Sequence, residues 1–168
     1  MDPIANKTLL IVWHSLTGGT LQMAQAAHDG ASRVAGLQVR MLRATDAGPP
    51  DVLAADGYLF AMPENLAAIS GLMKDFFDRC YYPALDCING RPYAALVCAG
   101  SDGANAVRQV ERIATGWRLR QVAPSLIVCT HAQTPEAILA AKTIAPAGLA
   151  ACRDIGEALG SGLAMGVF

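Results

Sequence analysis

The stretch Trp13-His14-Ser15-Leu16-Thr17-Gly18-Gly19-Thr20 lies between an apolar run, Leu9-Leu10-Ile11-Val12, and a helical pattern. Hydroxyl and glycine residues at such a junction are typical of an anion site, because a helix N-terminus offers unpaired backbone N–H groups and a partial positive charge. The glycines let the backbone come close to the anion. We therefore predict that this stretch holds a phosphate group. The alternative is an ordinary strand-to-helix turn with a capping threonine.

Length and composition favour one folded unit with a full core. The chain has 168 residues, of which 53% are hydrophobic and 16% are charged. This balance favours a large buried sheet over disorder, and we expect a single domain over residues 1–168. The net charge of −1 gives the chain no excess of positive charge with which to bind nucleic acid or an anionic membrane surface. We expect neither as a partner.

Targeting and cysteine patterns favour a cytoplasmic chain. Residues 1–7 are polar and lack the basic start of a secretory leader. No apolar run approaches the roughly 20 residues that a membrane span needs. The five cysteines are widely spaced and include no C-x-x-C pair, which argues against a disulfide framework and a zinc site. We predict no metal, and we interpret Cys98 and Cys129 as small core residues.

Apolar strand candidates alternate with amphipathic helix candidates along the chain. The strands are expected at residues 8–13, 37–41, 57–62, 93–99 and 126–129, and the helices at 20–35, 66–82, around 107–117, from 134 and at 149–159. Residues 44–50, with two prolines, are expected to be irregular. This alternation predicts an α/β, three-layer sandwich with a five-stranded parallel sheet. The second strand alternates apolar and polar residues like an edge strand, so the expected order is 2-1-3-4-5.

Three unusual loops follow the first, third and fourth predicted strands. In the expected order these strands are neighbours, and their carboxyl ends meet beside the switch point where ligands bind in such folds. The loops are residues 15–20, residues 63–66 and residues 99–103. Their convergence on one crevice is stronger evidence for a ligand site than any one loop.

The three loops resemble those of a known family. Ser15-x-Thr17-Gly18-x-Thr20 is similar to the phosphate loop of flavodoxins. Met62-Pro63-Glu64-Asn65, followed by Met73-Lys74-Asp75-Phe76-Phe77-Asp78-Arg79, resembles the flavodoxin-like NAD(P)H-dependent reductases. These are the FMN reductases and the quinone reductases once called tryptophan-repressor-binding proteins. Ala99-Gly100-Ser101-Asp102-Gly103 is similar to their third flavin loop. The resemblance covers about residues 7–130.

The resemblance implies a flavodoxin-like fold and an FMN site. By position, the phosphate would be held by Ser15, Leu16, Thr17, Gly18, Gly19 and Thr20. One edge of the ring would be lined by Pro63, Glu64, Asn65 and Leu66, with Glu64 expected to face solvent. The other edge would be lined by Ala99, Gly100, Ser101, Asp102 and Gly103. No catalytic side chain is expected, because the flavin itself would carry the hydride chemistry.

The implied activity is transfer of reducing equivalents from NAD(P)H through FMN to a quinone or a similar small acceptor. Neither ring loop contains an aromatic residue, which favours the open ring face of a hydride-accepting enzyme. The alternatives are an electron-carrier flavodoxin and a flavodoxin-like domain without redox activity. We also expect a homo-oligomer, because Phe76, Phe77, Tyr81 and Tyr82 crowd one helix that a single sheet cannot cover on every side.

Other polar residues have an ordinary and a functional interpretation. His14 either approaches the phosphate or packs beneath the loop. His131 ends a strand on the ligand side of the sheet, where its functional role would be contact with a nicotinamide or a second substrate. Arg118 and Arg120 either are solvated or meet the 2′-phosphate of NADPH.

Overall fold

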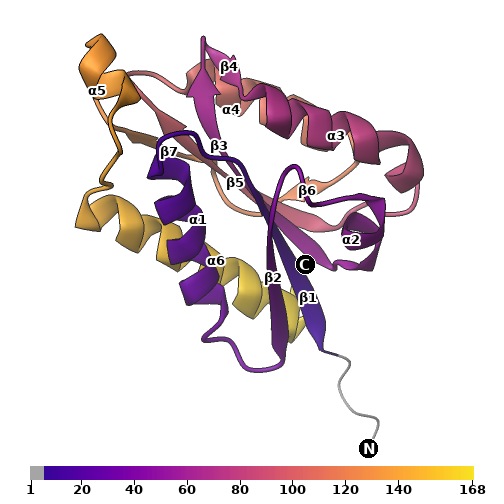
Figure 1. Ribbon diagram of the computed structural model, residues 1–168. Coiled ribbons are helices and arrows are strands. Elements are labelled where there is room, and N and C mark those ends of the chain that lie inside the picture. The colour runs from indigo at the N-terminus through magenta and orange to yellow at the C-terminus, as the bar shows by residue number, and fades with distance from the viewer. Residues whose placement is uncertain (1–5) are drawn as a thin grey trace, which may run out of the picture.

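The computed structural model describes residues 6–168 as three layers, with a central sheet between two sets of helices (Figure 1). The strands are β1 (Lys7–Trp13), β2 (Leu37–Arg43), β3 (Gly57–Asn65), β4 (Ala68–Ile69), β5 (Pro92–Ala99), β6 (Arg120–Gln121) and β7 (Leu126–Cys129). The helices are α1 (Gly19–Ala31), α2 (Pro49–Ala54), α3 (Gly71–Ala84), α4 (Ala104–Gly116), α5 (Pro135–Leu139) and α6 (Pro146–Met165).

The sheet confirms the predicted fold class and strand order. The order is β2-β1-β3-β5, with β6 and then β7 paired to β5 at the far edge, all in parallel. The sheet nevertheless has seven strands rather than the predicted five. The edge strand is divided into β6 and β7 because residues 122–125 lie opposite only two residues of β5, Ala94 and Ala95, so regular pairing is interrupted. Pro124 also lacks the N–H that a ladder hydrogen bond requires. The seventh strand, β4, pairs antiparallel with β3.

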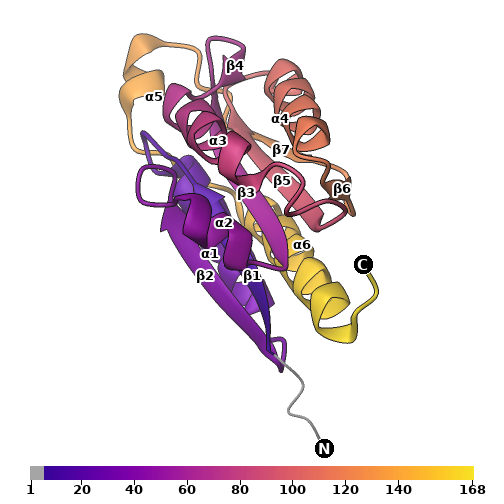
Figure 2. The ribbon, with the colours of Figure 1, turned by 90° about the vertical axis from the view of Figure 1, so that its right-hand side faces the viewer.

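The central strands β1, β3 and β5 are largely buried on both faces because helices cover each side. Leu9 and Ile11 of β1 pack with α1 and α6, while Leu10 and Val12 pack with α2, α3 and α4. Figures 1 and 2 show α1 and α6 on one face and α3 and α4 on the other. This two-sided cover explains why β1, β3 and β5 appear in the sequence as continuous apolar runs.

Several element boundaries differ from the predicted ones. Helix α1 ends at Ala31 rather than 35, because i→i+3 bonds tighten the chain there, such as Val34 N to Ala31 O at 3.0 Å. Residues 44–50 are not wholly irregular, since prolines are accepted in the first turn of a helix and α2 begins with Pro49 and Pro50. Helix α6 runs from Pro146 to Met165, beyond the predicted 149–159.

Helix α1 lies close to α6 because each helix places a glycine against the backbone of the other. A Cβ added at Gly156 of α6 would lie 2.0 Å from the carbonyl oxygen of Ala27, and one added at Gly30 of α1 would lie 2.1 Å from that of Arg153. Only hydrogen atoms fit between these backbones. The contact fixes the position of α1, and with it the loop at the start of α1.

No helix in residues 6–168 combines the length and apolar character needed to cross a membrane. The prediction about a leader rests on residues 1–7, of which residues 1–5 lie outside the described residues. Of the four crowded aromatics on α3, Phe76 and Phe77 are in the core, whereas Tyr81 and Tyr82 are exposed. The homo-oligomer and the single domain over 1–168 stay predictions.

Candidate functional site

The fold brings the three predicted loops to one edge of the sheet. They follow β1, β3 and β5, which are hydrogen-bonded neighbours with parallel register. Their carboxyl ends therefore lie side by side, as expected for a ligand crevice in a doubly wound sheet. The residues brought together are Ser15, Leu16, Thr17, Gly18, Gly19, Thr20, Pro63, Glu64, Asn65, Leu66, Ala99, Gly100, Ser101, Asp102 and Gly103.

The first loop forms a closed turn at the start of α1. Gly18 is the N-cap with a φ of 90°, and its N–H donates to Ser15 Oγ at 3.1 Å. A left-handed φ of this kind favours glycine. The N–H groups of the first helical turn then have no partner within the helix. The loop thus offers the N–H donors that a phosphate requires.

The segment around Lys142 and Ile144, distant in sequence, holds this loop in place. This contact was not predicted from the sequence. The Gln22 amide donates to Gly18 O at 3.0 Å and to Lys142 O at 2.7 Å. Lys142 N in turn donates to Thr17 O at 2.8 Å, and Ile144 N donates to Gln22 Oε1 at 3.0 Å. Gln22 lies one turn into α1, where a glutamine would ordinarily be solvated. No local signal connects it to Lys142.

Two buried side-chain oxygens at this edge have no hydrogen-bond partner. Among residues 6–168, the buried side-chain nitrogen and oxygen atoms without a partner are Thr20 Oγ1 and Glu64 Oε2. Thr20 is only 1% exposed. The Cys98 thiol lies near the Thr20 hydroxyl, but a thiol is only a weak acceptor. Burial raises the pKa of Cys98, and the nearby Thr20 hydroxyl opposes that rise. Unpaired buried polar atoms are rare and costly, so each one needs an explanation.

The placement of Glu64 corrects an expectation. The side chain was expected to face solvent, but Glu64 is half-buried and its Oε2 is enclosed. The reason is that β3 continues through Glu64 and Asn65 into a hairpin with β4, in the register Glu64 to Ile69 and Asn65 to Ala68. The hairpin also explains why α3 begins at Gly71 instead of 66.

The hairpin turn is strained and is held by α4. Leu66 and Ala67 have φ values of 51° and 61°, a left-handed conformation that costs free energy in residues other than glycine. Asn105 Nδ2 donates to Ala67 O at 2.5 Å, and Ile69 N donates to Gln109 Oε1 at 2.9 Å. These two α4 amides explain how the turn persists. Strain of this kind is concentrated at functional sites.

The third loop packs tightly against the end of β7. Gly103 is the N-cap of α4 with a φ of 83°, and an added Cβ would lie 2.8 Å from Ile127 Cγ2. Thr130 N donates to Ala99 O at 2.8 Å, and His131 N donates to Gly100 O at 2.7 Å. His131 is therefore next to the loop, on the predicted side of the sheet, and its side chain is exposed.

His14 interacts with α3. Its Nδ1 lies 2.8 Å from Ser70 Oγ at the start of α3, and its backbone N–H donates to Ala61 O. Burial lowers the pKa of His14. A lowered pKa favours the neutral imidazole. Through its contact with Ser70, this ring links the end of β1 to the start of α3.

Arg118 and Arg120 are remote from the three loops. Arg120 pairs with Pro92 at the start of β5, whereas the loops follow the ends of the strands. Arg118 forms an ion pair with Asp86, and the Arg120 guanidinium lies 5.9 Å from the Phe168 ring centre. The possible role at a 2′-phosphate is therefore not supported by their position, because a short edge strand carries them to the opposite end of the sheet.

The Lys-x-Phe-x-Asp-Arg pattern on α3 is structural. Lys74 pairs with Asp78 and Arg79 pairs with Asp75, both at 2.7 Å. Arg79 also donates to Ala44 O at 2.7 Å and to Ala47 O at 3.0 Å, which ties α3 to the segment before α2. Within residues 6–168, no cluster of three or more His, Cys, Asp or Glu has metal-binding geometry.

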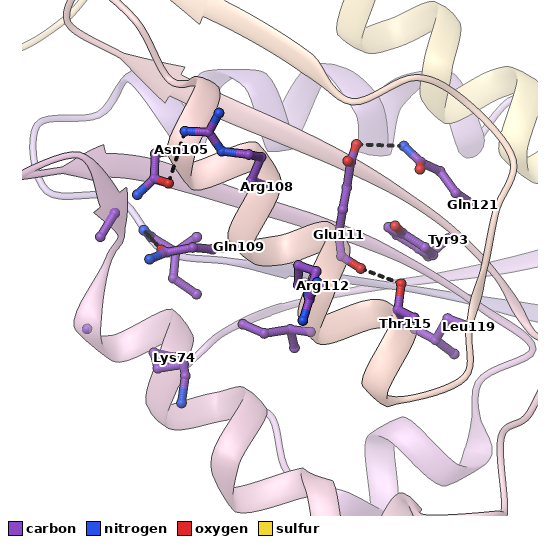
Figure 3. Close-up of a pocket in the computed structure, with 14 residues that line it drawn as sticks. Lys74, Tyr93, Asn105, Arg108, Gln109, Glu111, Arg112, Thr115, Leu119 and Gln121 are labelled. Atoms are coloured by element: carbon purple, nitrogen blue, oxygen red, sulfur yellow. Dashed lines mark hydrogen bonds between the residues drawn. The ribbon is translucent and has the colours of Figure 1, made fainter.

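One cavity borders the site, and a larger one lies outside it. One of about 490 Å³ borders the first loop, and its walls include His14, Ser15, Gly18 and Arg43. A larger one of about 980 Å³ lies on the outer face between α3 and α4 (Figure 3). The larger cavity does not include the first or third loop. A phosphate is expected at the first loop because the N–H groups of the first turn of α1 coincide there with two glycines and three hydroxyls.

The fold and these loops define a class: a doubly wound α/β domain with a loop rich in glycines and hydroxyls at the start of α1 and two further loops at its carboxyl edge. A family model for NADPH-dependent FMN reductases matches residues 45–134. The chain belongs to the NADPH-dependent FMN reductase family, which confirms the resemblance noted from the loops.

Curated relatives agree with the family. A flavodoxin from Aquifex aeolicus is 33% identical over 95 residues, covering 56% of this chain and 51% of the relative. An NAD(P)H dehydrogenase (quinone) from Acidithiobacillus ferrooxidans is 32% identical over 91 residues, covering 42% of this chain and 46% of the relative. The chain matches about half the length of these relatives.

Solved structures show the same fold. A flavodoxin from the domain Archaea superposes with a TM-score of 0.75 at 15% identity, over 93% of this chain and 98% of that one. A WrbA-like flavodoxin from Agrobacterium tumefaciens superposes with a TM-score of 0.74 at 18% identity, over 95% and 98%. These likenesses confirm the flavodoxin-like architecture.

Proposed function

We propose that this chain is an FMN-dependent oxidoreductase that takes reducing equivalents from NAD(P)H and delivers them to a quinone or a similar small acceptor. The observation that carries the proposal is the pair of unpartnered buried oxygens, Thr20 Oγ1 and Glu64 Oε2, in two of the three loops. A hydroxyl can donate a hydrogen bond, and a carboxylate can only accept one. FMN offers a partner of each kind, since its phosphate accepts and its ring carries an N–H.

The residues present fit the cofactor. The first loop would hold the phosphate through the N–H groups of the first turn of α1 and the hydroxyls of Ser15, Thr17 and Thr20. Residues 63–66 would line one edge of the ring, with Glu64 accepting from the ring N–H. Residues 99–103 would line the other edge, where Gly100 and Gly103 allow close backbone approach. Bound FMN would supply the hydride chemistry.

The protein's part is then to bind and orient. The Gln22 and Lys142 contacts keep the first loop in place before the phosphate arrives, so less ordering free energy is lost on binding. The α4 amides hold the strained hairpin in the same way. With no aromatic side chain in either ring loop, one face of the ring would stay open to a hydride donor.

The visible spectrum of the purified protein tests the cofactor directly. We expect flavin absorbance as isolated, or after FMN is added to the apoprotein. Oxidation of NADPH or NADH in the presence of a quinone then tests the activity. A protein that retains no flavin absorbance after excess FMN is added and the unbound FMN removed would overturn both the cofactor and the activity.

An electron carrier is the second candidate, favoured by the match to a flavodoxin over 56% of this chain. One assay distinguishes the carrier from the enzyme. Tight FMN binding without oxidation of either nicotinamide would support the carrier, and quinone-dependent turnover would support the enzyme.

The charge of Glu64 leads to a further prediction. If its carboxylate faces the ring, it disfavours the negative charge that the ring gains on reduction. Glu64→Gln should therefore raise the two-electron midpoint potential of bound FMN by about 30 mV, which corresponds to about 1.4 kcal/mol. Spectroelectrochemistry would measure it, with Glu136→Gln on the exposed helix α5 as the control. Equal potentials in wild type and Glu64→Gln would remove Glu64 from the ring site.

A further inference from the structure

The cavity between α3 and α4 has no role in the proposed flavin site. It measures about 980 Å³, at the upper end of the roughly 300–1,000 Å³ of small-molecule sites. Figure 3 shows it surrounded by side chains from α4 (among them Arg108, Glu111 and Arg112) and by Lys74 from α3. It is an open groove with Arg108 and Arg112 exposed at its rim, and its volume suits a small molecule.

The charged side chains around this cavity are mostly cationic and only partly neutralised. Among residues 6–168, no ion pair includes Arg108 or Arg112. Arg108 donates only to the neutral amide of Asn105, at 3.3 Å. The acidic lining residue, Glu111, accepts from Gln121 at 3.0 Å and from Ser125 at 2.8 Å. The guanidinium groups of Arg108 and Arg112, one turn apart on α4, therefore keep donors available for an anion.

The rest of the lining is largely apolar. Its apolar residues include Ala68 and Ile69 of β4, Ile113 of α4 and Leu119. Ile113 and Leu119 also pack against the main core on this face of the sheet, so their positions are fixed. An apolar surface beside two available guanidinium groups matches a ligand with an apolar body and an anionic head.

We propose that this cavity binds a small amphipathic carboxylate, with its head at Arg108 and Arg112 and its body on Ile113 and Leu119. The proposal does not depend on FMN binding. The cavity also reaches the two amides that hold the strained hairpin, Asn105 and Gln109. The backbone N–H of Ile69, which donates to Gln109 Oε1, therefore reports on occupancy.

The test is a titration of the full chain with decanoate, followed by backbone amide chemical shifts. Decylammonium has the same tail with the opposite charge, and sulfate is an anion without a tail. The variant Arg108→Gln/Arg112→Gln removes both guanidinium groups, and Thr115→Trp places a large ring at the cavity wall. Arg33→Gln, an exposed arginine at the end of α1, is the matched control.

We expect decanoate to shift the amides of Ala68, Ile69 and Leu119 with saturation, while decylammonium and sulfate leave them unmoved. The double arginine variant should bind decanoate about tenfold more weakly, because hydrogen bonds to charged groups are lost. Thr115→Trp should abolish the shifts, and Arg33→Gln should behave like wild type. Unmoved cavity amides, or equal affinity in the double variant, would overturn the proposal whether or not the protein binds FMN.

Discussion

Replacing Thr17 and Thr20 together by valine should weaken FMN binding by about 3 kcal/mol or more, because each hydrogen bond to a charged group contributes roughly 1.5–3 kcal/mol. The lower figure corresponds to about 150-fold in the dissociation constant. Valine keeps the branched shape of threonine, so the loop should keep its conformation. Fluorescence quenching of FMN on titration with apoprotein would measure the change.

The same substitution should not destabilise the apoprotein, although it weakens FMN binding. Thr20 Oγ1 is buried without a partner, and an unpaired buried hydroxyl costs free energy. Thr20→Val removes that cost, so apoprotein stability should be unchanged or higher while affinity falls. This split separates loss of a ligand contact from loss of folding.

Thr115→Val is the matched control, because its hydroxyl donates to Glu111 O within α4, away from the first loop. It should leave FMN affinity unchanged. If Thr17→Val/Thr20→Val binds FMN as tightly as wild type does, the first loop does not hold the phosphate.

Gly156→Ala should lower the free energy of unfolding by about 3 kcal/mol, at the upper end of ordinary overpacking. The new Cβ would lie 2.0 Å from the Ala27 carbonyl oxygen, and a backbone atom cannot rotate away. Helices α1 and α6 must therefore separate. For a domain of this size, the melting temperature should fall by about 6–12 °C, measurable by calorimetry.

The control for this substitution is Gly116→Ala at the end of α4, where an added Cβ meets nothing within 4 Å. Alanine is the better helix former by about 1 kcal/mol, so Gly116→Ala should be neutral or stabilising. Equal effects at Gly156 and Gly116 would mean that the close contact does not hold α1 in place. FMN affinity should fall with Gly156→Ala as well, because α1 carries the first loop.

The first loop and the strand order could be predicted because their signals are local. Leu9-Leu10-Ile11-Val12 is apolar at every position because β1 is covered on both faces, and such a run indicates a central parallel strand. The hydroxyls and glycines that follow it are next to one another in the chain. Strand order then follows from a general rule for alternating strands and helices.

The hairpin at residues 63–69 could not be predicted in the same way. Leu66 and Ala67 are not typical of a turn with positive φ, and Leu66 fits a helical apolar pattern equally well. Contacts from α4, 38 and 40 residues away, hold that turn. A local pattern contains no information about such partners.

By itself, then, the sequence determined the layers of the fold and the three loops that meet at one edge, since hydrophobic period and loop composition are properties of neighbouring residues. Tertiary structure alone decided which atoms are left unpaired there. Thr20 and Glu64 lack partners only because other elements bury them, and Gln22 braces the first loop through Lys142, 120 positions away. Burial and long-range hydrogen bonds depend on how the whole chain packs, so they exist only once it has folded.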